Sequence, residues 1–197
     1  SSAFAQVERD HLKPVGGIYD IYDFQFEYYS KVRKLLFEGL TDSPEIRFQV
    51  MPSFTPENVL DIEFDMDSSK YFVVYHICEK MIWYNENWKK IKVKAYRSEI
   101  DKVSVEIIKE LFEAAISGTR FPQKGMSGFD GTNYYFSINK YGLWSGTVWS
   151  PPKGSRMRRL VNIGNKLIEL VQSNNSLITL DKDLKQEINR LIVALKK

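Results

Sequence analysis

The stretch that most constrains this chain is residues 128–172, where two strand patterns, a sharp stop and a helix pattern follow one another. Residues 134–139 alternate between apolar and polar side chains, which is typical of a half-buried strand. The sequence Asn-Lys-Tyr-Gly at 139–142 predicts a turn into a second strand at 143–149, and so a β-hairpin. Pro151 and Pro152 lack the N–H groups that a sheet needs, so the second strand must end there.

A long amphipathic helix is expected directly after this stop. Ser155 is a residue type that favours the N-cap position. Apolar residues then recur every three or four positions as far as Val171, which predicts one buried helix face. Gly164 lies on that face, although glycine inside a helix costs about 1 kcal/mol relative to alanine. We interpret it as a sign that the helix lies very close to the sheet.

The rest of the chain predicts an α+β fold. The first helix is expected at residues 19–40, and it contains Phe24, Phe26, Tyr28 and Tyr29, which is more than one apolar stripe needs and suggests cover on more than one side. Short links between strands favour an antiparallel sheet of about six strands packed with about four helices. The further elements are strands near 46–50, 60–66, 71–78, 81–84 and 91–96 and helices near 101–117 and 181–197.

Length and composition predict one globular domain. The chain has 197 residues, enough for one hydrophobic core, and we assign residues 18–197 to the domain and 1–17 to an N-terminal arm. A net charge of +3 is too small to indicate nucleic-acid binding. No stretch reaches the roughly 18 consecutive apolar residues typical of a membrane-spanning helix.

The first residues resemble the end of a secretory signal peptide. Ala3-Phe4-Ala5 fits the small-x-small pattern of a cleavage site, with the charged and apolar regions upstream of the sequence. This pattern predicts a periplasmic or otherwise exported protein. The alternative is that these residues are a cloning remnant.

Histidine and cysteine offer little for chemistry. His76 and Cys78 are two residues apart and share one face of a predicted strand, where they could form a Cys–His pair. The apolar run around them favours two buried core residues instead. Two histidines and one cysteine in the whole chain do not suggest a metal site, and no cofactor is expected.

A stripe of carboxylates is the first candidate site. Asp61, Glu63, Asp65 and Asp67 alternate with apolar residues, so they share one face of a predicted strand. Two such acids, or Asp61 or Glu63 together with Asp130, could act in glycoside cleavage. The residues around them do not match a calcium-binding EF-hand loop. The competing interpretation is a solvent-exposed face whose charges pair with Lys92 and Lys94.

The second candidate is a basic cluster at the start of the long helix. A helix N-terminus attracts anions, and this one is surrounded by Lys153, Arg156, Arg158 and Arg159. Trp144 and Trp149 lie on the preceding hairpin and could stack on a ligand. The competing interpretation is a solvated helix end with both indoles in the core.

These patterns favour binding over catalysis. No nucleophile elbow, Walker loop, zinc-protease or dinucleotide motif is present. We therefore expect an exported, non-enzymatic binding module for a protein or an anionic glycan, with the basic cluster and the two indoles as its ligand-binding residues. The alternatives are a cell-envelope hydrolase with paired carboxylates, and a subunit whose last helix packs in an oligomer.

Overall fold

The computed structural model describes residues 10–16, 22–122, 130–173 and 176–197. They form a mostly antiparallel sheet of eight strands and four α-helices, which confirms the α+β class but exceeds the six strands predicted. The strands are β1 (Lys13–Pro14), β2 (Ile46–Pro52), β3 (Asn58–Asp65), β4 (Lys70–Cys78), β5 (Val93–Ile100), β6 (Thr132–Asn139), β7 (Leu143–Trp149) and β8 (Leu177–Ile178). The helices are α2 (Asp23–Leu36), α3 (Lys102–Ser117), α4 (Arg156–Gln172) and α5 (Lys182–Leu195), with a 3₁₀ turn, η1, at Trp88–Lys90.

The strands lie in one sheet in the order β1-β7-β6-β2-β3-β4-β5-β8. Neighbouring strands are antiparallel except β5 and β8, which pair in parallel. Two hairpins, β3–β4 and β6–β7, follow from turns in which Ser69, Tyr141 and Gly142 have positive φ. Strand β2 then joins the hairpins by pairing with β3 on one side and β6 on the other.

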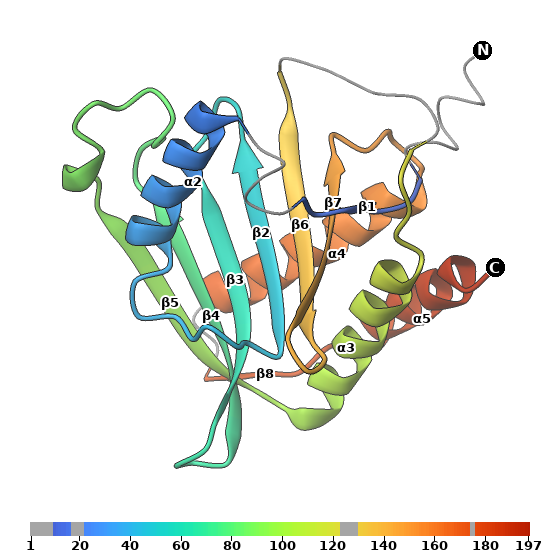
Figure 1. Ribbon diagram of the computed structural model, residues 1–197. Helices are drawn as coiled ribbons and strands as arrows, with labels where there is room; N and C mark the ends of the chain where they lie inside the picture. The colour runs from blue at the N-terminus through green and yellow to red at the C-terminus, as the bar shows by residue number, and fades with distance from the viewer. Residues whose placement is uncertain (1–9, 17–21, 123–129, 174–175) are drawn as a thin grey trace.

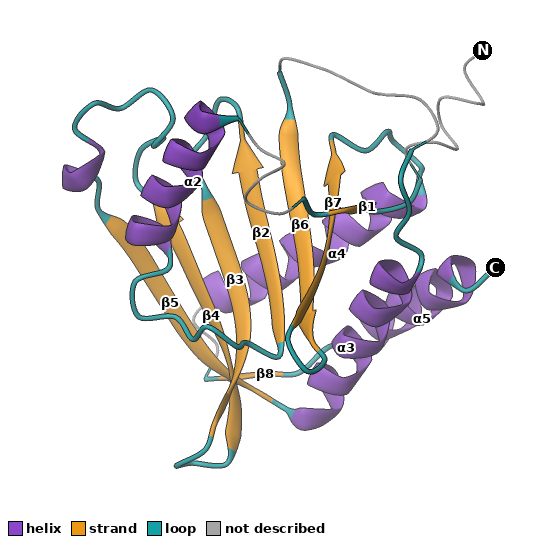
Figure 2. Ribbon diagram, in the orientation of Figure 1, coloured by secondary structure: helices purple, strands orange, loops and turns teal. Residues whose placement is uncertain are grey.

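Three helices cover one face of the sheet and a single helix covers part of the other (Figures 1 and 2). The larger core lies between the sheet and helices α3, α4 and α5. Alternate residues of the strands fill it, including Phe48, Ile62 and Phe136, because successive side chains on a strand point to opposite faces. The apolar stripe of α5, which the sequence left open for an oligomer, is buried in this core through Leu184, Ile188, Leu191 and Ile192.

Helix α2 packs over the opposite face and encloses a second, smaller core. Val32 and Leu36 of the helix meet Met51, Val59 and Cys78 of the sheet. The helix begins at Asp23 and ends at Leu36, whereas the sequence predicted 19–40, of which residues 19–21 lie outside the described part. One helix cannot cover eight strands, and among the described residues no other helix covers the β2–β6–β7 part of this face (Figure 1).

The close approach expected at Gly164 is present in the structure. A Cβ atom added there would lie 2.5 Å from a ring carbon of Phe48, far inside normal contact distance. Phe48 is fully buried and stacks between Tyr134 and Phe136. Helix α4 can therefore reach the sheet only because residue 164 has no side chain.

The N-cap predicted at Ser155 is confirmed, because its hydroxyl accepts a hydrogen bond from the backbone N–H three residues later. Asp101 and Asp181 act in the same way at the starts of α3 and α5. The predicted strand at 81–84 is wrong, because this segment is a loop leading to η1. No helix in the described ranges is long and apolar enough to cross a membrane.

The N-terminal segment is part of the domain rather than a free arm. Leu12 is fully buried in the larger core, and Lys13 and Pro14 pair with the outer edge of β7. A side chain at Gly146 would collide with Leu12, so β7 needs a glycine at this point. The domain therefore includes residues 10–14, whereas residues 1–9, with the suggested cleavage site, lie outside the described residues.

Candidate functional site

The two tryptophans of the predicted site lie on opposite faces of β7. Val148 points into the larger core, so Trp144, an even number of residues away, shares its side of the sheet, and Trp149 faces the α2 side. Trp144 is about half exposed and has the Lys140 ammonium 5.6 Å from its ring centroid. The structure therefore does not bring the two indoles into one concavity.

The start of α4 already holds an anion, which is the carboxylate of Asp10. One Asp10 oxygen accepts a hydrogen bond from the Arg156 Nε at 3.0 Å, and the other accepts one from the backbone N–H of Met157 at 3.1 Å. Arg156 also donates to the backbone carbonyls of Asp10 and Ala194. The helix end that was expected to bind a foreign anion is thus satisfied within the chain.

The other basic residues of the predicted cluster do not converge. Arg158 donates through its guanidinium to the carbonyl of Pro151, which closes the loop between β7 and α4. Lys153 is exposed, and Arg159 is half-buried one helical position further on. Of the six predicted residues, Arg156 and Arg158 therefore have structural roles, Trp144, Lys153 and Arg159 do not converge with them, and Trp149 lines the cavity described below.

The carboxylate stripe is divided among structural roles. Asp61 is completely buried and accepts two hydrogen bonds from the Arg47 guanidinium, at 2.8 and 2.6 Å. Glu63 accepts a hydrogen bond from the backbone N–H of Thr41, and Asp65 accepts two from the turn at 67–68. The predicted pairing with Lys92 and Lys94 is wrong, because β3 pairs with β2 and β4, and the basic residue of β5 that meets the stripe is Arg97, 3.6 Å from Asp65.

Burial raises the pKa of Asp61 to about 6, although the Arg47 guanidinium acts in the opposite direction. The folded protein then binds a proton more tightly than the unfolded chain, so this group favours folding at pH below 4 and loses that contribution as pH rises through 6. Relative to an Asp61→Asn variant, the free energy of unfolding of the wild type should fall by roughly 2 to 3 kcal/mol across this window. Urea unfolding of both proteins at pH 4 and pH 7 measures the difference, and parallel pH profiles would contradict it.

His76 and Cys78 are core residues, as the apolar run around them suggested. Both are buried, and His76 Nδ1 lies 2.9 Å from the carbonyl oxygen of Leu36 at the end of α2. Burial raises the pKa of the Cys78 thiol to about 12, and the nearby Glu57 carboxylate adds to the effect. In the described part of the chain, no three His, Cys, Asp or Glu side chains gather as metal ligands would.

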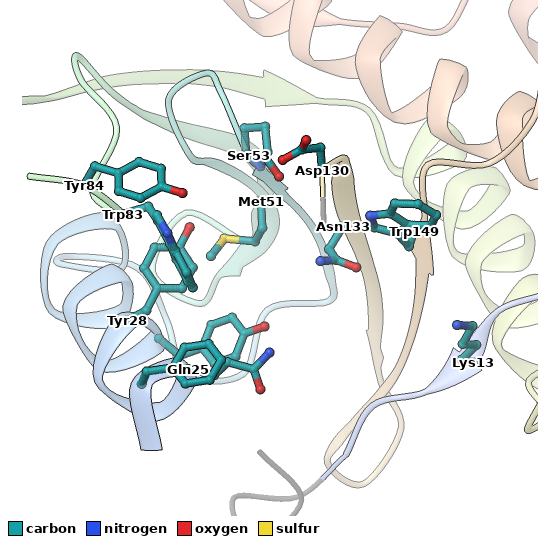
Figure 3. Close-up of a pocket in the computed structure, with 13 residues that line it drawn as sticks. Lys13, Gln25, Tyr28, Met51, Ser53, Trp83, Tyr84, Asp130, Asn133 and Trp149 are labelled. Atoms are coloured by element: carbon teal, nitrogen blue, oxygen red, sulfur yellow. The ribbon is translucent and has the colours of Figure 1, made fainter. Parts of the chain in front are cut away.

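A cleft of about 580 Å³ lies at the end of the sheet where α2 begins. We call it the aromatic cleft. Figure 3 shows Tyr28, Trp83 and Gln25 on one side and Asn133 and Trp149 on the opposite side. The lining residues are Lys13, Phe24, Gln25, Tyr28, Tyr29, Met51, Pro52, Ser53, Trp83, Tyr84, Asp130, Asn133 and Trp149.

One wall of the aromatic cleft is a chain of touching rings. Trp83 packs edge-on against Tyr28, with ring centroids 4.3 Å apart, and contacts Phe24 and Tyr84 at 6.3 and 6.2 Å. Phe24 and Tyr84 are 59% and 77% exposed, which is unusual for large aromatic side chains that could be buried. The cover that the sequence suggested for the aromatic residues of α2 is therefore absent at Phe24, and Phe26 is also exposed.

A buried carboxylate holds this wall in place. Glu57 is completely buried and accepts hydrogen bonds from the Tyr28 hydroxyl at 2.8 Å and from the backbone N–H of Ile82 at 2.9 Å. It thereby ties α2 to the loop that carries Trp83. Burial of the Tyr28 hydroxyl and the nearby Glu57 charge both raise the pKa of Tyr28, so this hydroxyl stays protonated and donates the hydrogen bond.

The opposite wall depends on a glycine. The backbone N–H of Ser53 donates to the carbonyl of Gly131, and the backbone N–H of Gly131 donates to the Ser53 hydroxyl. A Cβ atom at residue 131 would lie 2.4 Å from the indole nitrogen of Trp149, so the glycine lets the indole come close to the chain just before β6. Asp130 and Asn133 then face the cleft beside it.

A second cavity of about 460 Å³ continues along the open part of the sheet and shares Tyr29 with the aromatic cleft. The Tyr29 hydroxyl lies 3.1 Å from that of Tyr135, and this pair separates the two cavities. Beyond it, the sheet presents Gln49, Ser137, Ser145 and Thr147, all with hydrogen-bonding side chains. Together the cavities form a path along one face of the sheet.

The aromatic cleft was not predicted, because its residues come from distant segments. Residues near 24–29, 51–53, 83–84 and 130–149 meet only when β2, β6 and the loop after β4 are assembled around α2. The one signal in the sequence was the surplus of aromatic residues in α2. Comparison of the chain with protein-family models, with curated proteins and with solved structures finds no match.

Proposed function

We propose that this protein is a non-enzymatic binding module whose ligand occupies the aromatic cleft. The observation that carries the proposal is the exposed wall of rings formed by Phe24, Trp83 and Tyr84. Contact between water and exposed aromatic groups of this size is unfavourable, and a ligand that covers the rings gains that free energy. A cavity with several aromatic side chains and a few polar groups is typical of a binding site.

The lining residues favour a glycan among the partners expected from the sequence. Aromatic faces carry negative charge density and attract the partly positive C–H groups on the flat side of a sugar ring. Gln25, Asn133 and Ser53 can each donate and accept hydrogen bonds, as sugar hydroxyls require. Among the described residues that line the cleft, Lys13 and Asp130 are the charged ones and balance each other, so the cleft itself is suited to the rings of a glycan more than to its charges.

Catalysis by paired carboxylates has less support. A glycoside hydrolase needs two acids on either side of the bond that it cleaves. Asp130 lines the aromatic cleft without a second carboxylate, whereas Asp61 is buried against Arg47.

Titration with oligosaccharides tests the proposal. We expect tryptophan fluorescence to change when chitohexaose, cellohexaose or hexagalacturonate is added, because Trp83 and Trp149 line the cleft. Trp149→Ala and Trp83→Ala should each weaken binding at least tenfold, as truncation of a central aromatic contact does. Isothermal calorimetry provides the affinities.

Trp144→Ala is the matched control, since Trp144 lies on the other face of the same strand and is also exposed. It should bind like the wild type. Equal affinities of the three variants for the sugar would show that the ligand does not bind in the aromatic cleft. If none of the three sugars binds at millimolar concentration, the glycan assignment is wrong, and binding of a peptide library instead would point to a protein partner.

A further inference from the structure

Much of the net positive charge of this protein lies in the loop between β4 and β5. Residues 79–92 contain four lysines and two glutamates, a net charge of +2, whereas the whole chain has +3, so the remaining residues have a net charge of +1. We call Lys80, Lys89, Lys90 and Lys92 the basic lobe. All four side chains are exposed. Figure 1 shows the loop, with η1 in it, extending beyond the end of the sheet next to α2.

The lysines of the basic lobe have no carboxylate partner among the described residues. The ion pair that this loop does make joins Lys94 to Glu79, at 4.0 Å. Elsewhere lysines are commonly paired, for example Lys109 with Glu45 and Lys166 with Glu187. Lysines near the exposed edge of β5 also discourage pairing between copies of the sheet, but Lys80 and Lys89 lie in the loop, away from that edge.

Exposed aromatic side chains accompany these charges. Tyr84 is 77% exposed in the same loop, and Phe54 is 67% exposed in the loop between β2 and β3. The strand order and directions place both loops at one end of the sheet, together with the start of α2 (Figure 1). Tyrosine and phenylalanine beside lysines suit the boundary between water and a lipid bilayer.

We infer that the basic lobe docks this protein on the surface of an anionic lipid bilayer. Lysines near such a surface each strengthen binding about fivefold, and rings such as Tyr84 and Phe54 can enter the headgroup region. The lobe protrudes, and none of its lysines lines the aromatic cleft or the neighbouring cavity. A protruding charged loop fits a broad flat partner better than a narrow polymer.

This inference goes beyond the proposed function and depends mainly on the lysines of the basic lobe, although Tyr84 belongs to both surfaces. The aromatic cleft opens at the same end of the sheet, so a docked protein would hold its ligand close to the membrane. Trp149, on the far wall of the cleft, should have no part in docking. The Trp149→Ala variant should therefore bind vesicles like the wild type even if it has lost its ligand.

Sedimentation with vesicles tests the inference. Wild-type protein should co-sediment with phosphatidylcholine vesicles that contain phosphatidylglycerol, and not with phosphatidylcholine alone. The variant K89S/K90S/K92S should bind the anionic vesicles at least tenfold more weakly. Binding should also fall in concentrated salt, because the screening length shortens from about 10 Å at 0.1 M to about 3 Å at 1 M.

The matched control variant removes the same number of positive charges at positions outside the basic lobe. Lys102, Lys153 and Lys182 are exposed, lie on separate elements and have no ion pair among the described residues. The variant K102S/K153S/K182S should keep its vesicle binding. Equal loss in both triple variants, or no binding of the wild type to anionic vesicles, would overturn the inference. Binding of polygalacturonate in place of vesicles would overturn it too, in favour of an acidic polymer.

Discussion

Replacing Arg47 with alanine should lower the free energy of unfolding by about 3 to 5 kcal/mol. The change leaves the fully buried Asp61 carboxylate without the two hydrogen bonds that now satisfy it. It also removes a hydrogen bond to the Thr41 carbonyl and the contact of the guanidinium with the Phe37 ring. Urea unfolding at pH 7 measures the loss.

Arg33 supplies the control for this prediction. It forms an ion pair with Asp42 at 2.9 Å, but both side chains are largely exposed, at 72% and 92%. Exposed pairs of this kind contribute roughly 0 to 1 kcal/mol, so Arg33→Ala should be nearly neutral. A double variant, Arg47→Met with Asp61→Leu, should recover much of the lost stability, because it replaces a buried ion pair with apolar groups. Equal effects of the two arginine substitutions would contradict the prediction.

Gly164→Val should lower the free energy of unfolding by roughly 3 to 4 kcal/mol, which lies at the upper end of the range for an overpacked core. The valine side chain has to occupy the space of the Phe48 ring, which is fully buried and cannot turn away between Tyr134 and Phe136. Helix α4 would have to move off the sheet. Thermal and urea unfolding both report this change.

Gly118→Val is the matched substitution. An added Cβ there would lie 3.6 Å from the nearest backbone oxygen, an ordinary contact, so the effect should stay below about 1 kcal/mol. Phe48→Leu should relieve part of the strain in the Gly164→Val protein, which a double-mutant cycle detects as a coupling of about 0.5 to 3 kcal/mol. Strict additivity of the two changes would show that the ring and the glycine do not meet.

Features governed by neighbouring residues could be predicted from the sequence. The hairpin of β6 and β7 depends on residues within a few positions of one another, and so does the stop that Pro151 imposes after β7. The N-caps of α3 and α4 are equally local. Strands β1 and β8 were missed because two residues are too few to show any periodicity. The segment at 81–84 is apolar enough for a strand, but Glu57, more than twenty residues earlier, holds it as a loop.

The candidate site was harder to predict, for reasons that differ between residues. Trp144 and Trp149 are five positions apart, and an odd spacing on a strand already implies opposite faces, so this error was avoidable. Asp10 could not be foreseen as the partner of Arg156, because 146 positions separate them. The alternation in β3 identified a polar face correctly, but no pattern within one strand shows that α2 and Arg47 will cover Asp61.

Arg156 has a consequence for how the chain reaches its final form. It bonds to Asp10, near one end of the described chain, and to the carbonyl of Ala194, near the other. Contacts between such distant positions form late, because a long loop must close first. During synthesis on the ribosome, the start of α4 must therefore wait for α5 to emerge before its contacts are complete, and until then Arg156 cannot join Asp10 to α5.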